Sequence, residues 1–277
     1  MNITPQLCLR LSRIINGNVS SFGDTKNNCL ITNLRQFQVN VLGRNSTDPI
    51  NNAFWIARTS IPDKTLNLGF LALLETEVTP LVNTLTQLGF TITDISQYST
   101  FTTPRIIDVF FQSIESPIRF AQKARILSDL TNSLPQSQSQ TPTNPALQKL
   151  CTTFQNIIGI GGNAEFFNTS CDVLQSRNLK VKVNGIPTTI GSIGLLNFSF
   201  QSLDPQGNAL CIGSVGLLRK EVKPYLQTLR KQTSVVYSVL ISRWFTNPEV
   251  LLLRYITIAN PITFAIQTRE VLQVLKL

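Results

Sequence analysis

Hydroxyl and amide side chains are concentrated in one short stretch, ISQYSTFTTPR, between Ile95 and Arg105. Ser96 and Tyr98 carry hydroxyl groups there, and Asp108 follows as a carboxylate within the next apolar segment. A carboxylate can serve as a general base and a tyrosine hydroxyl as a general acid. The same groups can also hold a ligand through hydrogen bonds. We therefore expect a ligand-binding site at Ser96, Tyr98 and Asp108.

The chain contains no histidine. Histidine is the usual general base and the commonest metal ligand, so its absence excludes Ser-His and Cys-His nucleophile pairs and histidine-based zinc sites. We therefore expect no metal, no cofactor and a non-catalytic ligand- or partner-binding protein, with the ligand and the oligomeric state left open. The alternative is a histidine-free, hydrolase-like enzyme in which Glu77 or Asp108 is the base and Tyr98 the acid.

Two further pairs of charged residues occupy matching places in the two halves of the chain: Glu77 matches Glu221, and Arg125 matches Arg269. In a functional interpretation each glutamate is a base or cation ligand and each arginine binds an anion. In a structural interpretation each glutamate complements a helix dipole, while each arginine pairs with it or covers apolar surface. We favour the structural interpretation.

Positive charge is concentrated in the second half. Of the net charge of +9, residues 1–142 contribute +2 and residues 143–277 contribute +7. Five cations lie in or beside one expected helix, namely Arg219, Lys220, Lys223, Arg230 and Lys231. Such a cluster can bind a nucleotide-like ligand or an acidic partner, although no nucleic-acid-binding motif accompanies it. A solvated helix face is the simpler interpretation, and an anion-binding function is a further alternative.

The chain repeats one sequence pattern twice. LCLRLSRII (7–15) returns as LCTTFQNII (150–158), and GFLALLETEVTPL (69–81) returns as GSVGLLRKEVKPY (213–225). Phe54 matches Phe198, and we expect their 144-residue offset to stay constant through the rest of both copies. Duplication over this length predicts two homologous repeats that pack about a pseudo-two-fold axis.

A segment rich in Ser, Gln, Thr and Pro, LPQSQSQTPTNP, separates the copies. This composition cannot bury a core and is typical of a linker. We expect a first repeat at residues 1–133, a linker at 134–146 and a second repeat at 147–277.

Each copy mixes helical and strand patterns. FQVNVLG (37–43) and LKVKVNG (179–185) alternate apolar and polar residues, which predicts strands with one wet face. Ser116–Pro117 and Asn260–Pro261 have the N-cap and N1 residue types that begin helices. A further helix is expected to begin near Glu77. The hairpin-like order of these elements predicts an α+β fold with mixed or antiparallel sheets packed against helices.

The five cysteines form no CxxC pair, and their odd number argues against a disulfide framework. We expect all five to be free and buried: Cys8, Cys29, Cys151, Cys171 and Cys211. The N-terminal residues lack the pattern of a secretory signal, and no apolar run approaches the ~20 residues that span a bilayer. A cytoplasmic location without membrane contact is therefore expected.

The segment Gly69–Phe111, GFLALLETEVTPLVNTLTQLGFTITDISQYSTFTTPRIIDVFF, resembles the DUF1259 family, also called the LppY/LpqO family. The family pattern is an apolar strand, E-x-x-P-x-x-x-x-L, a glycine turn, a polar strand and a proline-containing strand, with the unit duplicated. The resemblance covers both halves and implies a short form without a signal peptide, of the type found in Gram-positive bacteria. It implies no particular activity.

Family members typically hold an H-x-H pair before the proline and another histidine on the following strand. The resemblance places these columns at Ser96, Tyr98 and Phe110, and in the second copy at Leu240, Ser242 and Arg254. None is histidine, and hydroxyl groups are weak ligands for transition metals. The resemblance therefore implies that a metal-type site of the family is degenerate here.

Overall fold

Two copies of the same α+β unit make up the structure, a computed structural model that describes residues 2–20, 28–135, 144–161, 163–167, 170–232 and 234–275. Most of the expected linker, residues 136–143, lies outside the described residues, so the domain boundaries remain a prediction. No helix in the described ranges is long and apolar enough to cross a membrane.

The first repeat contains, in order, α1 (Pro5–Ile15), β1 (Asn18–Val19), β2 (Asn28–Leu34), β3 (Val39–Val41), β4 (Arg44–Ser46), the 3-10 turn η1 (Asp48–Ile50), β5 (Asn51–Arg58), β6 (Thr65–Leu74), η2 (Glu75–Glu77), α2 (Val78–Gln87), β7 (Thr91–Gln97), β8 (Thr102–Thr103), β9 (Ile106–Glu115) and α3 (Pro117–Leu130). The second repeat contains α4 (Pro145–Ile158), β10 (Asn163–Phe167), β11 (Ser170–Ser176), β12 (Val181–Val183), β13 (Ile186–Thr188), η3 (Gly191–Gly194), β14 (Leu195–Gln201), β15 (Ala209–Leu218), α5 (Arg219–Leu229), β16 (Val236–Ile241), β17 (Thr246–Asn247), β18 (Val250–Ala259) and α6 (Pro261–Leu272). The α+β class and the duplication expected from the sequence are confirmed.

Polar caps begin the helices α1, α3 and α6, and those at Ser116 and Asn260 are the caps that the sequence predicts. The side chains of Thr4, Ser116 and Asn260 each accept a hydrogen bond from a backbone N–H in the first turn of α1, α3 and α6. A proline follows each cap, where its missing N–H is not needed. These local signals set where each helix starts, independently of tertiary packing.

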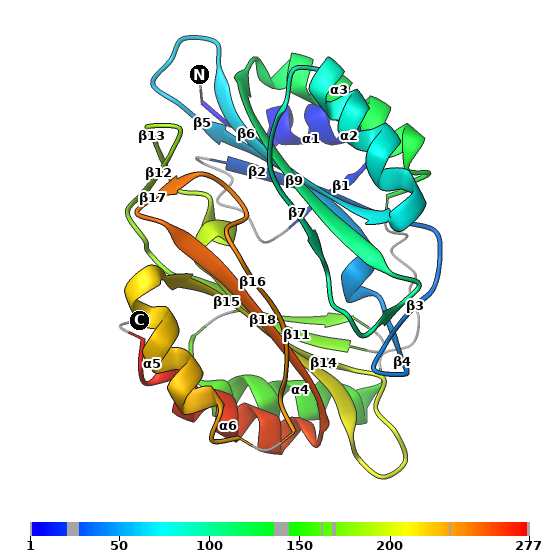
Figure 1. The fold of residues 1–277 in the computed structure, drawn as a ribbon, viewed down its shortest axis with the longest axis vertical. Helices are drawn as coiled ribbons and strands as arrows, with labels where there is room; N and C mark the ends of the chain where they lie inside the picture. Colours follow the sequence, from blue (N-terminus) through cyan, green and yellow to red (C-terminus); the bar gives the residue numbers. More distant parts are fainter. Residues whose placement is uncertain are drawn as a thin grey trace.

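Two six-stranded antiparallel sheets face each other, and the helices cover their outer faces (Figure 1). The strand orders are β1-β2-β5-β6-β9-β7 and β10-β11-β14-β15-β18-β16, so the same topology occurs twice. One core lies between each sheet and its own helices, which in the first repeat contains Leu81 and Phe120 and in the second Phe154 and Phe264. Further core lies between the sheets.

Each repeat has a small three-stranded sheet, β4-β3-β8 in the first and β13-β12-β17 in the second, that packs against the other repeat. In Figure 1 the β3–β4 hairpin lies beside the second repeat, and β12–β13 lies beside the first. Val39 and Val41 of β3 accordingly share a buried cluster with Ile212 and Ile256 of the second repeat. A matching cluster joins Val181, Val183 and Trp244 with Trp55 and Phe110 of the first repeat. Because each repeat completes a core of the other, the interface is part of the folded core.

The constant 144-residue offset is wrong in one place, the edge strands β7 and β16. Asp94 lies opposite Phe110, whereas Val239, 145 residues later, lies opposite Arg254. Each strand contains a bulge, between Ile92 and Asp94 in β7 and between Tyr237 and Val239 in β16. The bulges lie at equivalent places and do not cause the displacement, because the equivalent residues Thr91 and Val236, which precede them, are already 145 positions apart. The second repeat has one more residue before β16 and one fewer after it, which ungapped sequence matching could not detect.

The bulge residues join the repeats reciprocally. The hydroxyl of Thr93 donates to the backbone carbonyl of Arg243, and the hydroxyl of Ser238 donates to that of Tyr98 at 2.7 Å. Thr93 and Ser238 are equivalent in the shifted register, as are Tyr98 and Arg243. The predicted pseudo-two-fold axis therefore passes between β7 and β16.

A glycine in the central strand of each sheet lies beneath an aromatic ring. A Cβ atom added to Gly69 would lie 2.2 Å from the ring of Phe111, and one added to Gly213 would lie 2.3 Å from the ring of Tyr255. No side chain fits at that distance, so both positions require glycine because of the close approach.

The expectation of five free cysteines is wrong. Disulfides link Cys8 to Cys29 and Cys151 to Cys171, and Cys211 is the buried free cysteine. Each bond joins the first helix of a repeat to its second strand, α1 to β2 and α4 to β11, over 21 and 20 residues of sequence. The odd total of five arises because each repeat has one bonded pair and the second repeat has one further, unpaired cysteine.

Candidate functional site

The polar stretch that suggested a ligand site lies between the two sheets. The hydroxyl of Tyr98 donates a hydrogen bond to Asp48, and Arg254 of the second repeat lies over the Tyr98 ring, 3.9 Å from its centroid. Arg254 also donates to the Tyr98 carbonyl at 3.1 Å and to Asp108 at 3.5 Å. Tyr98 and Asp108 are thus brought together, and Arg254 occupies the space between them.

Burial dominates the electrostatics of this cluster. It raises the pKa of Asp108 to about 6, although the neighbouring Arg254 acts to lower it. Burial and the nearby Asp48 carboxylate also raise the pKa of Tyr98 well above its usual value. Asp108 is 1% exposed, and its Oδ1 atom has no hydrogen-bond partner among the described residues. The two repeats are therefore joined by a buried ion pair, and removing its charges from water costs free energy.

Ser96 belongs to a smaller pair at the sheet edge. Its hydroxyl donates to Asp94 at 2.6 Å, and burial raises the pKa of that carboxyl group. Although Ser96 lies opposite Asp108 in the strand register, its side chain is engaged with Asp94. The three residues expected to form one ligand site are therefore neighbours that make separate contacts.

The shifted register also changes which residues match across the repeats. Ser96 corresponds to Ile241 and Tyr98 to Arg243, so the assignment of Leu240 and Ser242 as their counterparts is wrong. Arg243 is buried, donates a hydrogen bond to the carbonyl of Ser192 and has its pKa lowered by burial to about 9. Sequence reasoning missed Arg243 because an ungapped alignment does not show the one-residue insertion before β16.

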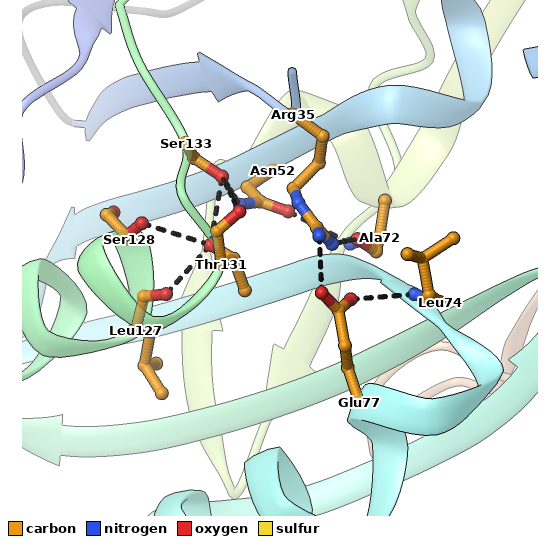
Figure 2. Close-up of polar contacts among 9 residues, drawn as sticks. All are labelled: Arg35, Asn52, Ala72, Leu74, Glu77, Leu127, Ser128, Thr131 and Ser133. Carbon is orange, nitrogen blue, oxygen red and sulfur yellow. Dashed lines mark hydrogen bonds and ion pairs between the residues drawn. The ribbon is translucent and has the colours of Figure 1, made fainter. Parts of the chain in front are cut away.

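Glu77 lies in another cluster, shown in Figure 2. Its carboxylate binds the guanidinium of Arg35 at 2.7 Å and accepts a hydrogen bond from the Leu74 backbone at 2.8 Å. Arg35, which is 4% exposed, also donates to the carbonyl of Ala72. The carboxylate therefore begins a helix and holds a buried cation, and it makes no hydrogen bond to Tyr98 within the described chain.

The same clamp occurs in the second repeat. Arg177 binds both carboxylate oxygens of Glu221 and donates to the Gly216 carbonyl at 2.8 Å. The hypothesis that Arg125 pairs with Glu77 is wrong, because Arg125 binds Asp129 on its own helix. A contact that is duplicated in this way fits the structural interpretation of both glutamates.

A buried hydroxyl network lies beside this clamp in the first repeat. Asn52 donates to Ser133 at 2.8 Å and to Thr131 at 3.3 Å, and it accepts from the Ala72 backbone at 2.9 Å (Figure 2). The second repeat has Leu196 at the position of Asn52. Because its polar groups are paired with one another, the network stabilises the end of α3 against the sheet.

A groove of about 740 Å³ lies between α5 and the strands β16 and β18. Its apolar surface comes from both sides, with Tyr237 and Leu240 exposed on the edge strand to 45% and 43%. The residues that line it are Arg219, Val222, Lys223, Leu226, Gln227, Arg230, Tyr237, Leu240 and Leu251. The groove therefore combines cations along one side with a hydrocarbon floor.

Three of the five cations predicted to bind anions line this groove, namely Arg219, Lys223 and Arg230. Arg219 forms an ion pair with Glu249. Lys223 and Arg230 are exposed, and no carboxylate of the described residues lies within ion-pair distance of either. The lining of the groove does not include Lys220 or Lys231. Two exposed cations therefore remain available to an anion.

The first repeat serves as an internal comparison. Helix α2 occupies the place of α5, but Glu75, Thr79 and Thr86 stand where the second repeat has Arg219, Lys223 and Arg230. The fold is the same, so it does not require these cations. The signal that identifies the groove is this difference between copies, together with the exposed apolar residues on β16.

Comparisons with known proteins identify a family and no function. The model of a family described as a Domain of Unknown Function (DUF1259) matches residues 10–129 and 152–274. No curated protein matches the chain. Among solved structures, EtuB from Clostridium kluyveri matches with a TM-score of 0.25 and 9% identity, over 94% of this chain and 92% of that one. This score is too low to bear on the fold or the function.

Proposed function

Because the chain belongs to the DUF1259 family, whose description assigns no activity, we propose from its own geometry that it is a non-catalytic binding protein. Its ligand is an organic anion that occupies the groove between α5 and β16. The observation that supports this most directly is the presence of Lys223 and Arg230, both without an acidic partner in the described residues, beside an apolar floor. Exposed cations beside apolar surface attract ligands that carry both kinds of group.

The central cluster provides less support for ligand binding. Tyr98 and Asp108 are almost fully buried and already contact Asp48 and Arg254. A ligand at that place would have to displace the Arg254 side chain from between the repeats. We therefore assign a structural function to the cluster, and we interpret the degenerate metal-type site implied by the family resemblance as filled by the protein itself.

A histidine-free enzyme is a weaker alternative. It requires Glu77 or Asp108 as the base and Tyr98 as the acid, whereas Glu77 contacts Arg35, and Asp108 and Tyr98 both contact Arg254. The carboxylate of Glu77 also accepts a hydrogen bond from the backbone N–H of Leu74. Both carboxylate oxygens of Glu77 are therefore already engaged, one by a buried guanidinium and the other by a backbone N–H.

The disulfides favour an oxidising compartment. Cys8–Cys29 and Cys151–Cys171 are bonded at equivalent places in the two repeats. Structural disulfides persist in oxidising environments and are rare in the cytosol. Our proposal therefore departs from the cytoplasmic location expected from the sequence.

Anion binding is tested with phenyl phosphate, which combines an acidic group with a small apolar one. We expect heat of binding in titration calorimetry, with an affinity that falls as NaCl rises from about 50 to about 500 mM because salt screens exposed charges. Benzyl alcohol is the neutral control and is expected to bind more weakly. Equal binding of both compounds, independent of salt, would contradict an anion site.

A further inference from the structure

The floor of the α5–β16 groove consists mainly of hydrocarbon. Val222 and Leu226 contribute from α5, and Tyr237, Leu240 and Leu251 contribute from the strands. Tyr237 and Leu240 are nearly half exposed, although leucine in particular is usually buried. Water leaves such a surface most favourably when another apolar group covers it.

The same floor offers little to a sugar or a base. Gln227 contributes an amide and Tyr237 a hydroxyl group, and the other uncharged residues that line the groove are aliphatic. Sites specific for polar ligands place several donors and acceptors around them, because each unpaired polar group lowers the affinity. The groove therefore fits an anion with a plain hydrocarbon part better than it fits a nucleotide.

The number of available cations in the groove indicates how many acidic groups the ligand carries. Lys223 and Arg230 are seven residues apart, about two helical turns or ~10 Å along α5, and therefore lie on the same side of the helix. Their long side chains can converge on one head group between them. Arg219, at the start of the helix, is held by Glu249. Two available cations match one phosphate or carboxylate better than a polyanion.

We propose that the groove binds a single-chain amphiphilic anion, such as an alkyl phosphate or a fatty acid. Its head group lies between Lys223 and Arg230, and its hydrocarbon chain lies along Leu226, Leu240 and Leu251. This inference rests on the proposed function and names its ligand class. The groove volume of about 740 Å³ lies in the range for small-molecule ligands.

The test is a series of methyl, hexyl and decyl phosphate, each titrated into the full chain below its micellar concentration. Each buried methylene strengthens binding by up to about fourfold, so decyl phosphate should bind at least about tenfold tighter than hexyl phosphate. Equal affinities across the series, with phenyl phosphate still bound, would overturn the inference and leave the proposed function standing. If none of these anions binds, both the inference and the proposed function are overturned.

Two matched variants test where the hydrocarbon chain of the ligand lies. Leu240→Ser removes an exposed apolar residue from the groove, and Ile95→Ser removes its structural equivalent in the first repeat, which is 48% exposed. We expect Leu240→Ser to weaken decyl phosphate at least about threefold with little effect on methyl phosphate, and Ile95→Ser to change neither, because only the first removes apolar contact area. Equal effects of both variants would contradict the placement.

A membrane surface would present the same head group on a two-chain lipid. Vesicles of phosphatidic acid and phosphatidylcholine distinguish that source in a sedimentation assay. We expect the protein to stay in the supernatant while decyl phosphate binds in calorimetry. Sedimentation with the vesicles, without binding of decyl phosphate, would overturn the inference in favour of membrane docking.

Discussion

Arg254 of the second repeat lies 3.9 Å above the ring of Tyr98 of the first and donates a hydrogen bond to Asp108. The cation comes from one copy of the duplicated unit and its partners come from the other. Phe110 occupies the equivalent position in the first repeat, so this contact has no second copy. The two repeats have diverged at their interface, and one guanidinium now satisfies groups on both sides.

Removal of this cation leaves Asp108 buried without its ionic partner. We expect Arg254→Leu to lower the free energy of unfolding by about 3 kcal/mol at pH 8, since breaking a buried ion pair leaves an uncompensated charge. At pH 5 the loss should be smaller, because Asp108 is then largely protonated. Urea unfolding at both pH values measures the difference.

Arg125→Leu is the control for that experiment. Its ion pair with Asp129 is solvent-exposed, so the expected change is below about 1 kcal/mol at either pH. A loss at Arg254 no larger than that at Arg125 would show that the buried contact does not hold the repeats together.

The raised pKa of Asp108 predicts a particular pH dependence of stability. Because the pKa is about 6 in the folded protein and has its ordinary value of 3.8 in an unfolded chain, folding takes up a proton between these values. The stabilisation is therefore complete below pH 3.8 and is lost as the pH rises through about 6, with a magnitude of about 3 kcal/mol. Asp108→Asn should lack this component.

The free energy of unfolding of Asp108→Asn relative to the wild type should therefore increase between pH 4 and pH 7. Comparing the two proteins cancels the contributions of other carboxyl groups. A constant difference across this range would show that Asp108 titrates normally in the folded protein.

The close approach at Gly213 predicts a steric effect. Gly213→Ala places a methyl group against the ring of Tyr255, and we expect a loss of about 1–3 kcal/mol from overpacking. Tyr255→Leu removes the ring, so the double variant should lose less than the sum of the single variants. Strictly additive losses in denaturant unfolding would indicate that the ring is not the obstacle.

The disulfides predict the number of reactive thiols. Without reductant, the denatured protein should react with a thiol reagent at Cys211 alone, and after reduction at all five cysteines. Mass spectrometry after alkylation counts the labels. Protein purified without exposure to oxidant that labels at five positions before reduction would contradict the paired state.

Much of the architecture could be predicted from local signals. The caps at Ser116 and Asn260 bind the helix residues that follow them, so the sequence alone indicates where α3 and α6 begin. The duplicated pattern likewise indicates the two repeats. The resemblance to the DUF1259 family also agrees with the family model that matches both halves.

Features that depend on tertiary geometry could not be predicted. One extra residue before β16 shifts this strand to a 145-residue offset from β7, and so the equivalence of Tyr98 and Arg243 was missed. The partner of Glu77, Arg35, is 42 residues away in the sequence, and nothing in the spacing indicates the pair. The basic residues in and beside α5 are evident in the sequence, but the groove also depends on β16, which lies beside that helix in the fold.

Lys223 and Arg230 are the residues through which the second repeat is proposed to bind an organic anion. The most direct measurement compares the affinity for phenyl phosphate of the wild type, of Lys223→Glu/Arg230→Glu, and of the control Lys149→Glu, which reverses an exposed charge on α4 of the same repeat. We expect the double variant to lose at least about tenfold in affinity and the control to lose less than about twofold, because salt screens distant charges. Equal losses of affinity in the double variant and the control, or no loss in either, would contradict anion binding by Lys223 and Arg230.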